Sequence, residues 1–443
     1  MLKTFSIGGI HPPDNKLAAQ SALRYLPPEG TVALFLGQHT GAPAEPIVNK
    51  GDKVKVGQLV AKASGFISAN LHASVSGTVT GIEPVADMSG FKKPAIVIQV
   101  EGDEWMPEID RSSDIIRDIT IDSRSIIQKI TNAGIVGLGG AAFPTHVKLT
   151  PPPGKKAEAI IINAAECEPY LAADHRVMLE YAEQTLIGTL LLKKALNVPK
   201  AYIGIEDNKP DAIKLLKELV AKQNYDIIIT PLKKRYPQGG EKQLIEAITG
   251  RQVPSMGLPV DVGVVVQNVS TALAVYEAVQ KNKPLFEHRI TITGKDAKQQ
   301  MNMVVRVGTP MSKILEAAGG LSENIAKIVC GGPMMGRAIS NIDAPTTKVS
   351  SGILLISEKE AMRKPESNCI RCAKCVEACP IGLEPYLLIK QAQRNMYDEL
   401  EAHRLQDCME CGCCLYSCPA HIPLLDYIRL ARAEVLKIMR SRN

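Results

Sequence analysis

The sequence predicts a multidomain α/β protein, and three observations carry this prediction. The chain has 443 residues, which is enough for three or four domains of ordinary size. Residues 157–230 alternate buried strand segments with helical segments, a pattern typical of a parallel sheet covered by helices. Residues 369–418 hold nine of the eleven cysteines, in a region rich in helix formers. We therefore expect an α/β domain in the middle of the chain and a helical domain at its end.

The composition excludes several classes of protein. Hydrophobic residues make up 45% of the chain and the formal net charge is only +6, so no nucleic acid or other polyanion is expected as a partner. No segment approaches the roughly 18 consecutive apolar residues of a membrane span. The first residues, MLKTFSIGGIHPP, lack the apolar region of an export signal. Eleven cysteines in a chain that is not exported indicate metal or redox use rather than disulfides.

Residues 30–101 contain short strand segments separated by glycine turns. The segments GDKVKVGQLVAKAS and HASVSGTVTGIEPV resemble the barrel-sandwich domains that carry lipoyl or biotinyl groups. Such a carrier needs a lysine at the tip of its central hairpin, and residues 65–76 contain none. We therefore expect residues 1–110 to form a barrel-sandwich (lipoyl-like) domain that serves as a docking or shielding domain and not as a swinging carrier arm. His72 is expected to be a structural turn residue rather than a ligand.

The middle of the chain predicts a parallel α/β domain with a glycine-rich loop before its first strand. Strands are expected over 157–164, 200–207 and 225–232 and a helix over 210–222, and Asp174 is expected to cap a helix that runs to about residue 196. The loop, residues 134–148, reads GIVGLGGAAFPTHVK. Glycines let backbone N–H groups approach a phosphate or a flavin ring closely, although a simple tight turn is the alternative. Because the loop precedes a strand, it is not a dinucleotide-binding fingerprint.

Four segments, in order, resemble the flavin and NADH site of the flavoprotein subunit of respiratory complex I. They are GGAAFPTHVK, NAAECEP, YPQGGE and QNVST, which begin at residues 139, 163, 236 and 267. The resemblance implies a Rossmann-like FMN/NADH domain over residues 111–285. Because no T-G-A-T flavinylation motif occurs, the FMN is expected to be noncovalent. The cofactor-binding residues that the resemblance implies are Gly137, Gly139, Gly140, Ala141, Phe143, Lys148, Asn163, Glu166, Glu168, Tyr236, Gly239, Gly240, Glu241, Asn268 and Thr271.

Within this set, the resemblance assigns different sides of the site. Its FMN contacts are Gly139, Gly140, Lys148, Asn163, Asn268 and Thr271, and its nucleotide side is Phe143, Glu166, Glu168 and Glu241. Carboxylates accept hydrogen bonds from ribose hydroxyls and oppose a 2′-phosphate, so NAD(H) is expected rather than NADP(H). The chain departs from the family pattern at Ala165, Gly240 and Gln267, where the family has Asp, Glu and Asn.

Residues 286–360 resemble the β-grasp domain that follows the flavin domain in the same subunit family. The segments that carry this resemblance are RITITGKD, NMVVRVGTPMSKILEAAGG and IVCGGPMMG. Thr309-Pro310 predicts the start of a helix and Gly319-Gly320 its end. Cys330 is expected to be a buried apolar residue.

Two cysteine runs in residues 361–443 predict a helical ferredoxin domain with two [4Fe–4S] clusters. Each run spells C-x-x-C-x-x-C-x-x-x-C-P, and the second follows the first by 39 residues. In such runs the cysteine before the proline ligates the neighbouring cluster. One cluster is thus assigned to Cys369, Cys372, Cys375 and Cys418, and the other to Cys408, Cys411, Cys414 and Cys379. The alternative is a pair of zinc sites, which usually show separated C-x-x-C pairs. Cys413 is expected to be a bystander that points away from the cluster. Helices are expected over 381–407 and from Pro423 onward.

The domain order as a whole resembles the RnfC (RsxC) family, the NADH-site subunits of ion-translocating Rnf electron-transport complexes. The resemblance covers essentially the whole chain. It implies electron transfer between NAD(H), FMN and two [4Fe–4S] clusters, coupled in the complex to ferredoxin oxidation or reduction and to movement of Na⁺ or H⁺. The implied partners are the iron–sulfur subunit RnfB and the membrane subunits, with ferredoxin reached indirectly. The implied location is peripheral, on the cytoplasmic side of the cell membrane.

Hydride transfer between a nicotinamide and a flavin needs no general acid or base, so no catalytic residue is predicted. Two other functions remain open from the sequence. One is a soluble NADH-dependent flavoprotein, such as a corrinoid reductase. The other is an electron-relay subunit without its own nucleotide site, which the departures at Ala165 and Gly240 favour. The basic end, residues 427–443, contacts anionic lipid or a partner, or is simply solvated.

Overall fold

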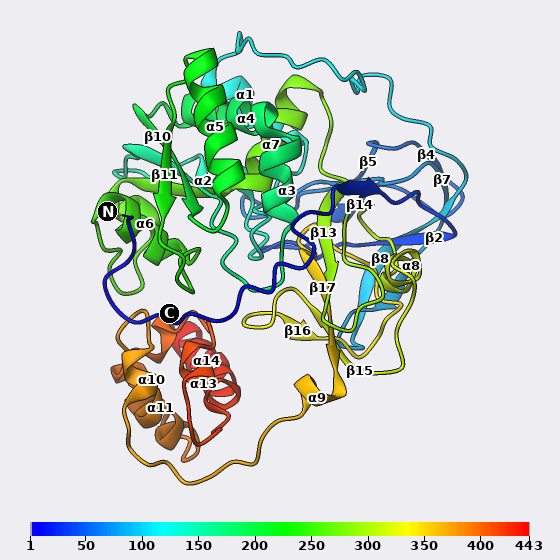
Figure 1. Cartoon of the computed structure of the whole chain (residues 1–443). Coiled ribbons are helices and arrows are strands. Elements are labelled where there is room, and N and C mark those ends of the chain that lie inside the picture. The colour runs from blue at the N-terminus through cyan, green and yellow to red at the C-terminus, as the bar shows by residue number, and fades with distance from the viewer. Residues whose placement is uncertain (1, 443) are drawn as a thin grey trace.

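The computed structural model describes residues 2–442, and Figure 1 shows their arrangement. Two small sheets, a parallel sheet with helices and a mixed sheet follow one another along the chain, and a helical module ends it. Residues 2–26 belong to none of the small sheets and run as an arm across the other parts. In this arm, Lys3 pairs with Leu232, Ile10 pairs with Tyr236, and β1 (Leu23–Tyr25) joins the edge of the mixed sheet.

Residues 31–100 form the sandwich that the sequence predicts. A four-stranded antiparallel sheet has the order β2-β8-β7-β4, and a three-stranded antiparallel sheet has the order β3-β5-β6. The two sheets share one apolar core, which includes Leu34, Val60 and Ile96. The strands are β2 (Thr31–Phe35), β3 (Glu45–Pro46), β4 (Lys53–Val54), β5 (Leu59–Lys62), β6 (Leu71–His72), β7 (Gly77–Ala86) and β8 (Lys92–Val100).

A four-stranded parallel sheet with the order β11-β10-β9-β12 forms the centre of the α/β domain. In β9, Ile160 and Ile162 pack into the core under α4 and α7, whereas Ile161 packs into the core under α6. The strand is apolar throughout because both of its faces are covered. The elements are α1 (Ser123–Asn132), α2 (Thr145–Lys148), β9 (Ala159–Asn163), α3 (Ala173–Glu180), α4 (Ala182–Leu196), β10 (Lys200–Glu206), α5 (Pro210–Gln223), β11 (Ile228–Leu232), α6 (Glu241–Thr249), η1 (Pro259–Val262), β12 (Val264–Asn268) and α7 (Val269–Gln280).

The long helix expected from Asp174 to residue 196 is wrong in two respects. Tyr181 leaves the helical conformation (φ −124°, ψ 34°) and divides the segment into α3 and α4. Asp174 does not cap α3, because it lies within the first turn and its carboxylate accepts hydrogen bonds from Asn268 and Ser270. The free N–H groups at the start of α3 are instead accepted by the Glu166 carboxylate.

The mixed sheet has the strand order β1-β14-β13-β17-β15-β16. Its outer strand β1 comes from the N-terminal arm and pairs in parallel with β14, so the arm is part of the fold of this sheet. The helix predicted between Thr309-Pro310 and Gly319-Gly320 is confirmed as α8. The elements are β13 (Glu287–Thr293), β14 (Met301–Arg306), α8 (Met311–Ala317), β15 (Ile325–Cys330), β16 (Arg337–Ala338), β17 (Gly352–Ser357) and α9 (Glu358–Ala361).

From residue 362 to 442 the described chain contains helices and no strands, as the sequence predicts. Leu388 of α11, Leu400 of α12 and Ile428 of α14 form its core together with several cysteines. Figure 1 shows this module below the parallel sheet, on the side where the N-terminal arm passes. The helices are α10 (Lys374–Glu377), α11 (Pro385–Ala392), α12 (Tyr397–Ala402), η2 (Leu405–Asp407), α13 (Cys413–Tyr416) and α14 (Leu424–Ser441).

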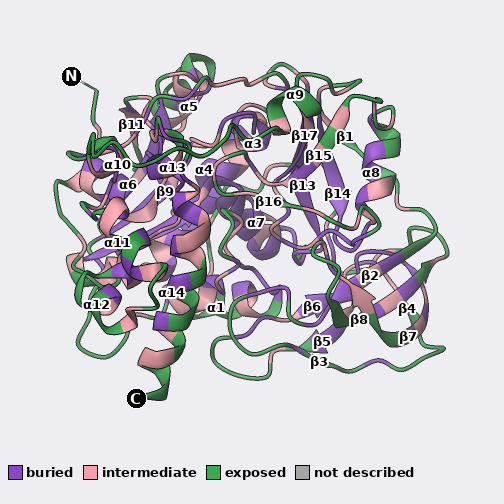
Figure 2. Ribbon diagram, turned by 90° about the horizontal axis from the view of Figure 1, so that it is seen from below, coloured by how far each residue is buried: buried purple, intermediate pink, exposed green. Residues whose placement is uncertain are grey.

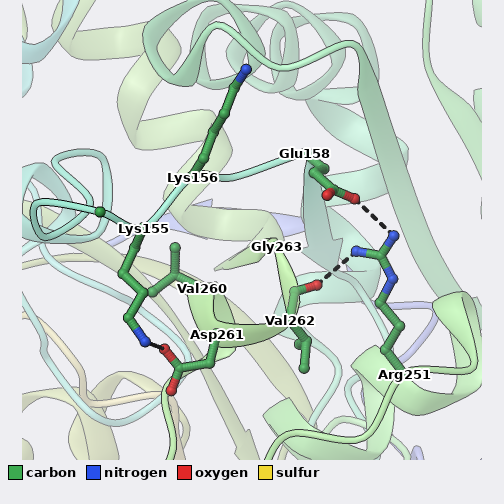
Figure 3. Close-up of a pocket in the computed structure, with 9 residues that line it drawn as sticks. Lys155, Lys156, Glu158, Arg251, Val260, Asp261, Val262 and Gly263 are labelled. Atoms are coloured by element: carbon green, nitrogen blue, oxygen red, sulfur yellow. Dashed lines mark hydrogen bonds and ion pairs between the residues drawn. The ribbon is translucent and has the colours of Figure 1, made fainter.

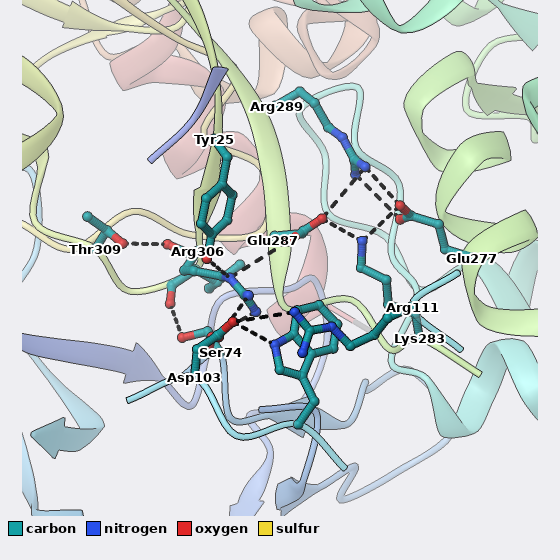
Figure 4. A network of polar contacts seen from close by, with 12 residues as sticks. Tyr25, Ser74, Asp103, Arg111, Glu277, Lys283, Glu287, Arg289, Arg306 and Thr309 are labelled. Atoms are coloured by element: carbon teal, nitrogen blue, oxygen red, sulfur yellow. Dashed lines mark hydrogen bonds and ion pairs between the residues drawn. The ribbon is translucent and has the colours of Figure 1, made fainter. Parts of the chain in front are cut away.

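A buried ionic network joins the mixed sheet to its neighbours (Figure 4). The Arg306 guanidinium donates to the Ser74 carbonyl oxygen (3.1 Å), to Asp103 Oδ1 (3.2 Å) and to the Tyr25 hydroxyl (3.0 Å). On the other side, Arg289 donates to Glu277 of α7 (2.9 Å). Figure 2 shows the central strands of the mixed sheet, β13, β14 and β17, as mostly buried.

Candidate functional site

The segments that resemble a flavin site meet at the carboxyl ends of β9 and β12. Asn163 ends β9 and Asn268 ends β12, and the two residues are register partners in the sheet. Asn163 Nδ2 donates to the Gly239 carbonyl oxygen (2.8 Å), and a Cβ atom on Gly139 would lie 3.3 Å from Asn268 Cβ. The carboxyl edge of a parallel sheet is where α/β domains usually bind ligands. The fold therefore brings together residues that are more than 120 positions apart in the sequence.

The glycine-rich loop closes on itself and presents its tip to solvent. The Gly137 N–H donates to the Phe143 carbonyl oxygen (2.8 Å), and the Leu138 N–H donates to Thr271 Oγ1 (2.9 Å). At the tip, Gly139, Gly140 and Ala141 are all exposed. Gly140 has a φ of +113°, a backbone conformation that glycine adopts readily. The sandwich supports the loop from outside, since Thr40 Oγ1 donates to the Ala141 carbonyl oxygen (2.7 Å).

Lys148, the only basic residue of the predicted set, lies at this edge of the sheet. Its Nζ donates to Glu241 Oε1 (2.7 Å) and to the Val266 carbonyl oxygen (3.1 Å). Both partners of the ion pair are partly exposed, at 30% and 40% of their side-chain surface. Exposed pairs of this kind contribute only about 0–1 kcal/mol, so Lys148 can exchange Glu241 for a bound anion at little cost.

Glu166 and Glu168 lie near the site, but their carboxylates hold protein backbone. Glu166 accepts from the N–H groups of Asp174 (2.7 Å) and His175 (3.2 Å). Glu168 reaches the mixed sheet and accepts from the N–H groups of Met334 (3.1 Å) and Met335 (2.7 Å). Burial raises the pKa of Glu168, while the two backbone N–H groups oppose this rise. Both carboxylates therefore fix the loop that carries them.

Two lysines that the sequence analysis missed, the half-buried Lys16 and the buried Lys209, support the same loop. Lys16 Nζ, from the N-terminal arm, donates to the carbonyl oxygens of Glu166 (2.8 Å), Glu168 (2.9 Å) and Leu171 (2.6 Å). Lys209 Nζ donates to the Ala165 carbonyl oxygen (2.6 Å). Burial lowers the pKa of Lys16. Lys16 lies about 150 positions before the loop, so no sequence pattern connects the two.

The residues present fit a flavin mononucleotide. Gln267 Nε2 and Thr145 Oγ1 are buried polar atoms without a hydrogen-bond partner in the described protein, and both belong to the segments of the site. Buried polar atoms are normally paired, so these two favour a polar ligand. The exposed N–H groups of a glycine loop and the Lys148 ammonium match a phosphate and the polar edge of a flavin.

Cysteines from the two runs lie close to one another in the helical module. Burial raises the pKa of Cys408 to about 12, and the nearby thiols of Cys411 and Cys379 contribute to this rise. Burial raises the pKa of Cys375, and the charge of the nearby Cys418 raises it as well. In both runs the residue after the second cysteine, Ala373 or Gly412, is left-handed and starts a short helix, α10 or α13. Within residues 2–442, no three His, Cys, Asp or Glu side chains converge closely enough to share a single metal ion.

Cys413 is buried next to Cys411 and packs with Tyr236 and Ile10. Cys413 is the first residue of α13. Its expected role as a bystander to the cluster stays a prediction. His72 is not a turn residue: it lies in β6 and is buried.

The α/β domain directly contacts both cysteine runs, at the loop of the second and at the end of the first. Tyr236 Oη donates to the Cys411 carbonyl oxygen (2.9 Å), and Gln243 Nε2 of α6 donates to the Pro380 carbonyl oxygen (3.0 Å). A Cβ on Gly240 would lie 2.8 Å from Met409 Cε. Gly240 thus lies directly beside the loop of the second cysteine run.

A surface cavity lies elsewhere. It measures about 380 Å³ and is lined by residues at the amino ends of β9 and β12, including Lys155, Lys156 and Arg251. Figure 3 shows that two of these cations are already paired, Lys155 with Asp261 (2.5 Å) and Arg251 with Glu158 (2.7 Å). It lies at the end of the sheet opposite to Asn163 and Asn268, so it is not part of the candidate site.

Four family models match this chain in series. They are the RnfC barrel sandwich hybrid domain over residues 3–103, the Nuo51 FMN-binding domain over 130–277, the SLBB domain over 289–338 and the 4Fe-4S dicluster domain over 361–419. A subunit of the proton-translocating ferredoxin:NAD⁺ oxidoreductase complex of Clostridium ljungdahlii is 46% identical, over 98% of this chain and 94% of its own. Its counterpart in the Na⁺-translocating ferredoxin:NAD⁺ oxidoreductase complex of Acetobacterium woodii is 43% identical, over 98% of each chain.

The chain belongs to the RnfC family.

A third RnfC-family relative, from the ion-translocating oxidoreductase complex of Rhodobacter capsulatus, is 40% identical over 87% of this chain and 75% of its own. The matches confirm the predicted recognition and the predicted cofactors, FMN and [4Fe–4S] clusters. They also confirm the barrel-sandwich prediction for the N-terminal part. No helix in residues 2–442 of this RnfC-family chain combines the length and the apolar character of a membrane span.

Proposed function

We propose that the chain is the peripheral NADH-side subunit of a membrane-bound, ion-translocating ferredoxin:NAD⁺ oxidoreductase complex. Its near-full-length likeness to the corresponding subunits of two such complexes supports this function. The observation that carries the electron-transfer role is the contact between Tyr236 and Cys411, which joins the flavin-site segments to a cysteine run. Electrons would pass between NAD(H), FMN and two [4Fe–4S] clusters within this one chain.

The residues of this chain bind and orient the reactants, and FMN supplies the exchange between a hydride pair and single electrons. Lys148 and the glycine-loop N–H groups would hold FMN, together with Asn163, Asn268 and Thr271. Phe143 and Glu241 remain as the side chains for the nucleotide, because Glu166 and Glu168 hold backbone N–H groups. The thiols of Cys369, Cys372, Cys375 and Cys418 would hold the first cluster, and those of Cys408, Cys411, Cys414 and Cys379 the second.

The partners that follow from this function are an iron–sulfur subunit of the RnfB type and the membrane subunits, with the chain on the cytoplasmic side. Purification of a tagged full-length chain from detergent-solubilised membranes tests this placement. We expect membrane subunits to co-purify, together with NAD⁺ reduction by reduced ferredoxin. Recovery of the chain alone from the soluble fraction, active with NADH and a dye, would instead favour a soluble flavoprotein such as a corrinoid reductase.

A further inference from the structure

The two cysteine runs stand in different surroundings. The second run is partly covered by the rest of the protein: Cys411, Cys413 and Cys414 are buried, and Tyr236, together with Ile10 of the N-terminal arm, packs against Cys411 and Cys413. The first run begins in an irregular segment, residues 362–373, that has no helix or strand and is exposed along its length. The two clusters are therefore not equivalent positions for exchange with another protein.

Residues 362–374, which we name the exchange face, carry an excess of positive charge. The segment contains Arg363, Lys364, Arg371 and Lys374 against the single acidic residue Glu366. Arg363 is paired with Asp426 (2.5 Å). No ion pair is formed within residues 2–442 by the other three basic side chains. Like-charged side chains that lack partners raise the local potential and attract an acidic surface.

The exchange face also exposes large apolar side chains beside these cations. Ile370, which lies between the first two cysteines, is 69% exposed, and Met362 is 70% exposed. Protein–protein interfaces combine an apolar core with a polar rim, and complementary charges speed the encounter of the partners. Because Ile370 adjoins two proposed ligands of the first cluster, a partner that covers it would lie directly over that cluster.

We propose that the exchange face is the docking surface through which the first cluster exchanges single electrons with an acidic iron–sulfur protein. The inference rests on the proposed function, which supplies the two clusters and the FMN. The second cluster, held against the flavin domain by Tyr236, is then the one that exchanges electrons with FMN. In the docking step one electron moves between the first cluster and the partner's cluster, one being oxidised and the other reduced, and no bond forms or breaks.

A second basic opening offers a matched control. It measures about 190 Å³ and lies beside Cys408 of the second run, lined by Arg337, Arg429 and Arg432 among others. Two of these cations share one carboxylate, Glu410, through Arg429 Nε (3.1 Å) and an Arg432 nitrogen (3.0 Å). Arg337 is exposed and lies in β16 of the mixed sheet. Charge reversal at Arg337 therefore changes the charge of a basic surface in the same direction, but at the other cluster.

The test is the rate at which a reduced, acidic two-cluster ferredoxin reduces the clusters of the full-length holoprotein, followed by anaerobic stopped-flow absorption. In Lys364→Glu/Lys374→Glu we expect the second-order rate constant at low salt to fall about tenfold and its salt dependence to flatten. Ile370→Ser should lower the rate constant at every salt concentration. Arg337→Glu should stay within about twofold of the wild type. The variants avoid the cysteines, and iron content confirms that both clusters are present.

Two results would overturn the proposal. One is a Lys364→Glu/Lys374→Glu variant with full iron content and an unchanged rate constant and salt dependence. The other is a larger loss in Arg337→Glu, which would place docking at the second cluster. A failure of the proposed function can be told apart from a failure of the docking proposal. If the proposed function is wrong, NADH does not bleach flavin in the wild type or in any variant.

Discussion

At the residue scale, the chemistry of a side chain is easier to predict than the partner it finds. Lys148 and Asn163 lie at the carboxyl edge of the parallel sheet, because their segments are tied to the ends of α2 and β9. Glu166 and Glu168 were expected to face a nucleotide. Their carboxylates instead accept hydrogen bonds from backbone N–H groups, at the start of α3 and in the loop at Met334. Local sequence cannot reveal this role, since Glu168 meets a partner 166 positions away.

Lys148→Met tests the flavin assignment at this scale. A charge-assisted hydrogen bond to a bound anion is worth about 1.5–3 kcal/mol, so we expect FMN affinity to fall roughly ten- to hundredfold. The measurement is FMN per chain after anaerobic gel filtration, followed by fluorescence titration of the apoprotein with FMN. The control is Lys155→Met, which removes a lysine at the opposite end of the sheet. Equal FMN affinity in both variants and the wild type would contradict the role of Lys148.

At the scale of elements, periodicity and turn signals determined much of the fold in advance. The strands β9, β10 and β11 and the helices α5 and α8 lie where apolar runs, prolines and glycines predict them. Two features could not be predicted, for one physical reason: both depend on contacts between distant segments. The first is the break between α3 and α4 at Tyr181, where the Arg289 guanidinium lies 5.4 Å from the Tyr181 ring. The second is β1, which gains its strand structure only by pairing with β14.

Tyr236→Phe tests the contact between the flavin domain and the second cysteine run. The change removes the hydroxyl that donates to the Cys411 carbonyl oxygen and keeps the ring. We expect the step from reduced flavin to the clusters to slow several-fold, as the contact loosens by about 1 kcal/mol. Tyr225→Phe is the control, because its hydroxyl bonds Glu183 far from the cysteines. Rapid-freeze electron paramagnetic resonance gives the cluster rate, and an unchanged rate in Tyr236→Phe would contradict the prediction.

At the scale of the whole molecule, three parts meet at one buried lysine. Lys348, from the mixed-sheet part, donates to the carbonyl oxygens of Asn70 in the sandwich (2.9 Å) and Gly134 in the flavin domain (2.7 Å). Burial lowers its pKa from the usual 10.5 to about 7. The sequence alone gives no sign of this junction, because a lysine in an irregular segment is normally solvated.

The lowered pKa predicts a pH dependence of stability. Between about pH 7 and pH 10 the unfolded chain holds the Lys348 proton and the folded chain releases it, so stability rises with pH in this window. We expect the melting temperature of the wild type to rise relative to that of Lys348→Met from pH 7 to pH 9. The pKa values of the neighbouring His39 and His72 are lowered to about 4 and about 3, mainly by burial, so neither titrates there. A constant difference in melting temperature across this range would refute the prediction.

The central claim is that one chain carries electrons from NADH through FMN to two cubane clusters. The most direct test is anaerobic purification with analysis of iron, sulfide and flavin, followed by NADH addition under spectroscopic observation. The account predicts about eight irons and eight sulfides per chain, one noncovalent FMN, bleaching of the flavin and then reduction of the clusters. Eight irons without flavin, and no spectral response to NADH, would contradict it and leave only an electron relay.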